Sequence, residues 1–138
     1  HGNYNVSENY RAALFLIKKI FLHSHCQFVF AGTNVKKQLA SKVKPHKNIQ
    51  FVDNPTTHQM NSLIRNAHIN VLPTFQPAGV KLKLINSLYL GRHCIVNKNM
   101  VIPYPELKQL CIVCGSKEEF QTQLISTMKI PFTKIIGS

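Results

Sequence analysis

A glycine, two lysines and an asparagine stand close together in residues 73–96, PTFQPAGVKLKLINSLYLGRHCIV, a stretch otherwise rich in leucine and other apolar residues. Gly79 has no side chain, so a ligand can approach its backbone closely. Lys81 and Lys83 supply positive charge, and the Asn86 amide can donate and accept hydrogen bonds. These residue types suit a site for a phosphate group and a sugar.

Helical spacing arranges these four residues. We expect a helix over about 79–90, in which Gly79, Lys83 and Asn86 share one face while Lys81 lies nearly opposite Lys83. Asn86 is a poor residue for the middle of a helix and its neighbours are apolar, so a buried amide there would need a partner. We therefore expect Lys83 and Asn86 to contact one ligand, although a solvated lysine beside an incidental asparagine is the alternative.

The loop before this helix offers a second feature of an anion site. An expected strand ends near residue 73, and the loop that follows contains Thr74 and Gln76 before Gly79 and Val80. The first N–H groups of a helix have no partner within the helix, and the helix dipole is positive at that end. The loop therefore predicts an anion bound by backbone N–H groups.

Strand-like and helix-like segments alternate along the whole chain. The expected strands are 27–31, 48–52, 69–73, 93–97 and 111–114, and the expected helices are 8–23, 34–43, 57–68, 79–90 and 117–128; residues 98–109 are expected to form a loop and a short turn. Continuous apolar strands between helices indicate a parallel sheet covered on both faces. We expect an α/β domain with a doubly wound parallel sheet, Rossmann-like and three-layered, whose ligands bind beyond the carboxyl ends of the strands.

Composition narrows the function classes. The 138 residues suit one domain, and 17 lysines and arginines against 5 acidic residues give a net charge of +12. Such a charge favours phosphorylated ligands, anionic membrane surfaces or nucleic acid. The lysines are spread along the chain and are dense only over 36–47, so nucleic acid is the less favoured partner.

The four cysteines, Cys26, Cys94, Cys111 and Cys114, do not suggest a disulfide framework in a chain of this length. We expect reduced thiols and a cytoplasmic location. Cys111 and Cys114 have CxxC spacing, but the residues between them are apolar and β-branched, which indicates a buried strand; no metal site is expected. The chain begins His-Gly-Asn, and we interpret it as a piece of a longer protein.

The segment 79–96, GVKLKLINSLYLGRHCIV, resembles the signature of group 1 retaining glycosyltransferases with the GT-B fold. Residues 1–9, HGNYNVSEN, resemble the first strand and helix of the C-terminal domain of that family, and the order of the elements between them also fits. The resemblance implies that residues 1–138 are a single donor-binding domain, one half of a two-domain enzyme. The acceptor, a glycan or lipid, would bind an N-terminal domain outside this chain, and peripheral contact with an anionic membrane at its inner face would be compatible with the charge.

The resemblance also implies roles for particular residues. Gly79 and Val80 would meet the diphosphate of a nucleotide-diphosphate sugar, and Lys81 and Lys83 would neutralise its charge. Asn86 stands where the family has a glutamate that binds the ribose. Ala78 stands where a second glutamate binds the sugar, a contact that Gln76 could replace.

The same resemblance assigns residues in the first half of the chain to the donor site. Asn3 and Tyr4 would border the first loop, and Val52, Asp53 and Asn54 would border the nucleotide base. The implied enzyme is a glycosyltransferase that needs no metal, with catalytic residues not assigned, and this chain alone is expected to be inactive. Charge stabilisation of the leaving diphosphate would do much of the catalysis.

Two other functions fit parts of the sequence. A basic module that binds nucleic acid or a membrane surface would show binding that falls steeply with salt. A receiver-like signalling domain would use Asp53, Thr74 and Lys98, but it also needs an acidic pair after the first strand to hold Mg²⁺. Only Glu8 lies near that position.

Overall fold

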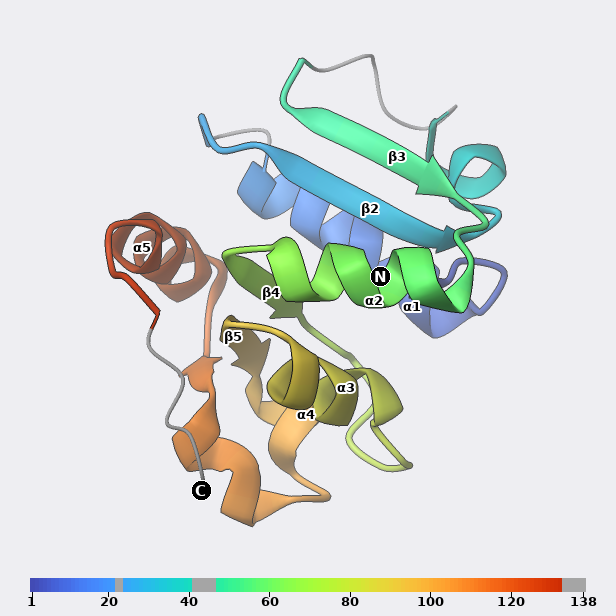
Figure 1. The fold of residues 1–138 in the computed structure, drawn as a ribbon. Helices are drawn as coiled ribbons and strands as arrows, with labels where there is room; N and C mark the ends of the chain where they lie inside the picture. Colours follow the sequence, from blue (N-terminus) through green and yellow to red (C-terminus); the bar gives the residue numbers. More distant parts are fainter. Residues whose placement is uncertain (22–23, 41–46, 133–138) are drawn as a thin grey trace. The chain divides into compact units, whose positions relative to one another are not determined.

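The computed structural model describes residues 1–21, 24–40 and 47–132 (Figure 1). The chain divides into two compact units, residues 1–60 and 61–138. Each unit contains a three-stranded parallel sheet with helices, so the protein is a mixed α/β structure, as the alternating pattern predicts. The boundary falls within helix α2 (Thr57–Asn66).

The first unit has the strand order β1-β2-β3. Its strands are β1 (Gly2–Asn3), β2 (Phe28–Thr33) and β3 (Ile49–Asp53). Helix α1 (Ser7–Phe15) continues into a π-helical segment, η1 (Leu16–Ile20), and a second π-helical segment, η3 (Lys36–Ala40), follows β2. The ends of the expected helices 8–23 and 34–43 fall on residues 22–23 and 41–43, which lie outside the described residues.

An aromatic stack and a glycine fix the packing of β2. The rings of Phe21 and Phe28 are stacked with centroids 3.7 Å apart, and Phe30 packs at an angle to Phe21 at 5.6 Å. Gly32 lies opposite Gly2 of β1, and a Cβ atom at Gly32 would collide with the Gly2 carbonyl oxygen and the Tyr4 ring. Only glycine therefore allows β1 and β2 to approach so closely.

The second unit has the strand order β4-β5-β6. Its elements are β4 (Ile69–Leu72), α3 (Leu82–Leu90), β5 (His93–Asn97), α4 (Lys98–Val101), the 3-10 helix η4 (Pro105–Leu110), β6 (Ile112–Cys114) and α5 (Lys117–Met128). Strand β5 and helix α5 have the predicted bounds. The region expected to be a loop and a turn, 98–109, contains α4 and most of η4.

Helices cover both faces of the second sheet. Cys94 and Val96 of β5 belong to an apolar cluster with Leu84 of α3, and the cluster also contains Met100. Ile95 points to the opposite face, since side chains alternate along a strand, and α5 packs against β5 and β6. Helices α3 and α5 therefore lie on opposite faces of this sheet.

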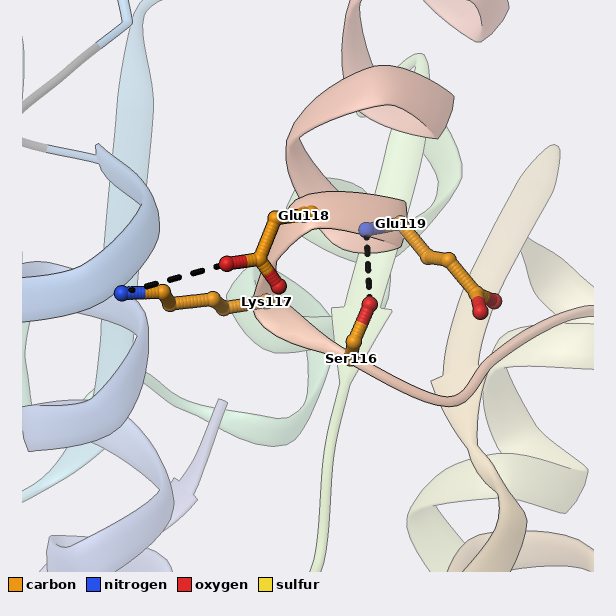
Figure 2. Close-up of polar contacts among 4 residues, drawn as sticks. All are labelled: Ser116, Lys117, Glu118 and Glu119. Atoms are coloured by element: carbon orange, nitrogen blue, oxygen red, sulfur yellow. Dashed lines mark hydrogen bonds and ion pairs between the residues drawn. The ribbon is translucent and has the colours of Figure 1, made fainter.

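Local polar contacts decide where α5 begins (Figure 2). The Ser116 side chain accepts a hydrogen bond from the Glu119 N–H at 3.2 Å, and the Gly115 N–H donates to the Glu119 carboxylate at 2.9 Å. Ser116 thus satisfies one N–H group of the first turn, and the Glu119 carboxylate satisfies the N–H of Gly115 just before the helix. The Lys117–Glu118 ion pair, 4.0 Å long, is exposed and contributes little to stability.

Candidate functional site

The loop between β4 and α3 differs from its expected form in one important respect. Helix α3 begins at Leu82, three residues later than predicted, and Gly79 lies in the loop before it with a φ of +96°. Gly79 therefore does not share a helical stripe with Lys83 and Asn86. A positive φ suits glycine, and the space around its missing Cβ is open apart from the Gln76 side chain at 3.8 Å.

Lys81 occupies the cap position of α3 and is buried, with 8% of its surface exposed. Its ammonium group donates a hydrogen bond to the carbonyl oxygen of Gln76 at 2.6 Å. This contact folds the loop 76–81 back on itself at the start of the helix. The expected position of Lys81, on the first helical turn opposite Lys83, is wrong because the helix has not yet begun there.

Lys83 and Asn86 lie one turn apart on α3, as predicted. Lys83 is half-buried and Asn86 is exposed. The expectation of a buried amide at position 86 is therefore wrong: apolar residues surround Asn86 in the sequence, but several of them are exposed as well, including Leu82 and Ile85. Asn86 is open to solvent and to a ligand that approaches this face of the helix.

A pair of hydrogen bonds joins the ends of β4 and β5. The Thr74 N–H donates to the Asn97 side-chain oxygen at 3.0 Å, and the Asn97 amide nitrogen donates to the Thr74 carbonyl oxygen at 2.7 Å. The Thr74 hydroxyl accepts from the Gln76 N–H at 3.2 Å. Asn97 and Thr74 thus fix the first residues of the loop that leads to Gly79.

Asn97 ends an expected strand, and residues 97–100 are candidates for a ligand site from their place at the carboxyl end of that strand. The sequence does not predict its pairing with Thr74. The reciprocal pairing depends on β4 and β5 being neighbours, and Leu72 pairs with Val96 in the observed register. Only the fold shows this function of Asn97, which is to position the loop.

The predicted site residues of the first unit gather at the carboxyl end of its sheet. Asp53 ends β3, and its carboxylate accepts the Lys36 N–H at 3.3 Å. Asn54 follows with a φ of +48°, and its side-chain oxygen accepts the Asn34 N–H at 3.0 Å. Val52 is half-buried in β3. The side chains of Asp53 and Asn54 therefore fix the loop after β2 through hydrogen bonds to its backbone. Both residues are also exposed.

Asn3 and Tyr4 have different environments. The Asn3 side chain is exposed and accepts the Asn5 N–H at 3.0 Å. Tyr4 is only 3% exposed, and burial raises the pKa of its hydroxyl well above the ordinary value of 10.0. Asn3 is accessible to a ligand, whereas Tyr4 belongs to the core that supports the loop.

An amide network at the same edge was not predicted. The Asn5 side-chain oxygen accepts hydrogen bonds from the amide groups of Asn34 and Gln38, each at 3.2 Å. Asn34 and Gln38 are each about thirty positions from Asn5 in the chain, so no local pattern connects them to it. The frequent asparagines of residues 1–9 were the only sequence signal.

The structure thus sorts the predicted residues into two groups, one in each unit. The first group is Asn3, Tyr4, Val52, Asp53 and Asn54, and the second is Thr74, Gln76, Gly79, Val80, Lys81, Lys83 and Asn86. Within each group the residues lie at or beyond the carboxyl ends of parallel strands, or on the helix that follows, which is where ligands bind in α/β sheets.

Among residues 1–21, 24–40 and 47–132, no three histidine, cysteine, aspartate or glutamate side chains are grouped so that they could hold a metal ion. Within the same ranges no helix has the length and apolar character to cross a membrane.

Comparisons of the chain with protein-family models, with curated proteins and with solved structures found no match.

Proposed function

We propose that the chain is the donor-binding domain of a group 1 retaining glycosyltransferase of the GT-B class, and that it binds a nucleotide-diphosphate sugar at the start of α3. The observation that carries the proposal is the environment of Lys81, whose buried ammonium group lies at the N-terminus of α3 and 2.6 Å from the Gln76 carbonyl oxygen.

Charge explains why this arrangement suits an anion. The N-terminus of a helix is the positive end of its dipole, so a cation buried there is unfavourable. An anion, in contrast, is attracted by the helix dipole and by the buried ammonium group. Lys83 adds a second positive charge within the first turn. Gly79, in the loop, leaves open space beside the backbone. A diphosphate carries enough negative charge to interact with all of these groups.

The same groups support a role in catalysis. In glycosyl transfer the nucleoside diphosphate leaves the sugar as an anion. Lys81, Lys83 and the N–H groups at the start of α3 would stabilise that developing charge. Asn86, exposed one turn further along, would contact the ribose. An acceptor glycan or lipid would come from another domain of the enzyme.

The strand orders support the proposed doubly wound, Rossmann-like sheet. Each unit has three parallel strands with helical segments between them, which is the arrangement of each half of a doubly wound nucleotide-binding domain. In that proposal residues 1–138 form one donor-binding domain. The resemblance of residues 79–96 to the family signature points to the same fold.

Thermal unfolding with nucleoside diphosphates tests the proposal. UDP, GDP or ADP should raise the melting temperature, because a ligand at 100 times its Kd stabilises the folded protein by about 2.7 kcal/mol. Lys83→Ala should weaken this binding about tenfold or more, since a hydrogen bond to a charged group contributes about 1.5–3 kcal/mol.

Lys108→Ala is the matched control, because Lys108 is an exposed lysine of the same unit on η4 and should leave the shift unchanged. If none of the three diphosphates, at millimolar concentration, changes the melting temperature, the proposed function is wrong. An equal loss of binding in both lysine variants would show attraction to the overall charge, and not a site at α3.

A further inference from the structure

Two cysteines lie opposite each other on neighbouring strands of the second unit. Ile95 of β5 pairs with Ile112 of β6, so the residues immediately before them, Cys94 and Cys111, are opposite each other across the same pair of strands. Both side chains pack in the apolar cluster beneath α3. They therefore point to the same face of the sheet.

The two thiols differ in burial and in ionisation. Cys94 is almost fully buried, whereas Cys111 is only partly buried. Hydrogen bonding between the two thiols lowers the pKa of Cys111 and, together with burial, raises the pKa of Cys94. The pair is thus asymmetric: Cys111 is the more accessible and the more readily ionised thiol.

We propose that Cys111 is a site of oxidative modification by small-molecule disulfides and that Cys94 then displaces the adduct to form a Cys94–Cys111 disulfide. In the first step the Cys111 thiolate attacks one sulfur of the oxidant RSSR, forming a mixed disulfide and releasing RS⁻. In the second step Cys94 loses its proton and attacks the Cys111 sulfur, and a second RS⁻ leaves. The oxidant takes up two electrons, and the protein loses two thiol protons.

Strand geometry permits the bond. Neighbouring strands are about 4.8 Å apart, which lies within the range of about 4.4–6.8 Å between the Cα atoms of cysteines in disulfides. Side-chain rotation can therefore close the bond while β5 and β6 keep their register. The reaction needs no metal ion and no group from the other unit.

The CxxC spacing does not offer a competing bond. Cys111 and Cys114 are three residues apart on an extended segment, so their side chains point to opposite faces of the sheet. Cys114 lies opposite Asn97, is almost fully buried, and has a pKa raised to about 11 by burial and by the nearby Glu119 carboxylate. Because the Cys114 side chain points to the other face of the sheet, its thiol is not placed to attack an adduct on Cys111.

The experiment treats the native chain with oxidised glutathione and then alkylates the remaining thiols, with mass spectrometry of the digested protein. We expect the wild type to lose two of its four alkylatable thiols and to yield a peptide pair joined through Cys94 and Cys111. Cys94→Ala should instead retain glutathione on Cys111, because the second step is blocked. Cys111→Ser should leave Cys94 reduced.

Cys114→Ser serves as the control for substitution of a buried thiol, and it should form the Cys94–Cys111 bond as the wild type does. Circular dichroism before oxidation verifies that each variant is folded. Glutathione retained on Cys111 in the wild type would overturn the proposal. A bond through Cys114 or Cys26 in place of Cys94, or oxidation of Cys94 in the Cys111→Ser variant, would overturn it as well.

Discussion

Lys81 and Lys83 are two positions apart, yet they have different tasks in the structure. Lys81 precedes α3, is buried and holds the Gln76 carbonyl, whereas Lys83 lies on the first turn and is half-buried. Composition and spacing indicate that both lysines are candidates to bind a phosphate. They could not show which lysine also supports the loop, because that depends on where the helix begins.

Substitution of Gly79 tests the backbone of this loop. Gly79→Ala should lower the free energy of unfolding by about 1–2 kcal/mol, because a side chain is unfavourable at a positive φ such as the +96° observed here. Urea denaturation measures the change. Gly115→Ala is the control, since its Cβ would make only ordinary contacts with the Glu119 and Lys98 side chains. Equal effects of the two substitutions would contradict the assigned backbone conformation.

Tyr4 predicts a change of stability with pH. Burial holds its folded-state pKa above the value of 10.0 expected in the unfolded chain, so the hydroxyl stays neutral in the folded protein while it ionises in the unfolded one. The contribution of Tyr4 is fully present below pH 10.0 and is lost as the pH rises above it, at about 1.4 kcal/mol per pH unit.

The measurement compares urea denaturation of the wild type and Tyr4→Phe from neutral pH to above pH 10. The difference between them should be constant up to about pH 10 and should then shift in favour of Tyr4→Phe. This comparison removes the effects of pH that the two proteins share. Parallel pH profiles for the two proteins would show that Tyr4 is not buried in this way.

Among the elements, those with strong local signals were predicted well. The apolar run of β5 and the helix α5, with Ser116 before its first turn, have the expected bounds. The start of α3 was wrong because the apolar pattern continues through Val80, although that residue is 71% exposed and lies before the helix. Sequence periodicity does not show the positive φ at Gly79 that delays the helix.

The sequence did not predict the contacts between elements that are distant in the chain. The Asn97–Thr74 pair joins residues 23 positions apart, and Asn34 and Asn54 are 20 positions apart. Such pairs form because parallel strands bring their carboxyl ends to one edge. The edge was predicted from the strand–helix alternation, but the polar pairs along it were not.

Removal of the Asn97 side chain tests the coupling of β4 and β5. Asn97→Ala deletes two hydrogen bonds to the buried Thr74 backbone, so the free energy of unfolding should fall by about 1–3 kcal/mol. Chemical denaturation measures the loss. Asn86→Ala is the matched control, because Asn86 is exposed on α3 and its loss should change stability by less than about 0.5 kcal/mol. A larger loss from Asn86→Ala than from Asn97→Ala would contradict the described contacts.

At the scale of the whole molecule, each unit has three parallel strands and its own polar edge. The net charge of +12 is compatible with a diphosphate ligand, but also with a general attraction to polyanions. The place at which the anion binds distinguishes a diphosphate site from a general attraction to polyanions. A donor site concentrates binding at the loop before α3, whereas a general attraction follows the exposed lysines along the chain.

An NMR titration of the isotopically labelled chain with UDP, GDP and ADP, following the backbone amide signals, tests whether a nucleoside diphosphate binds at the start of α3. We expect saturable shifts at the amides of residues 79–83 for at least one of these nucleotides, and their loss in Lys83→Ala. Shifts confined to lysine-rich segments away from α3, or no saturable shift at residues 79–83 with any of the three, would contradict it.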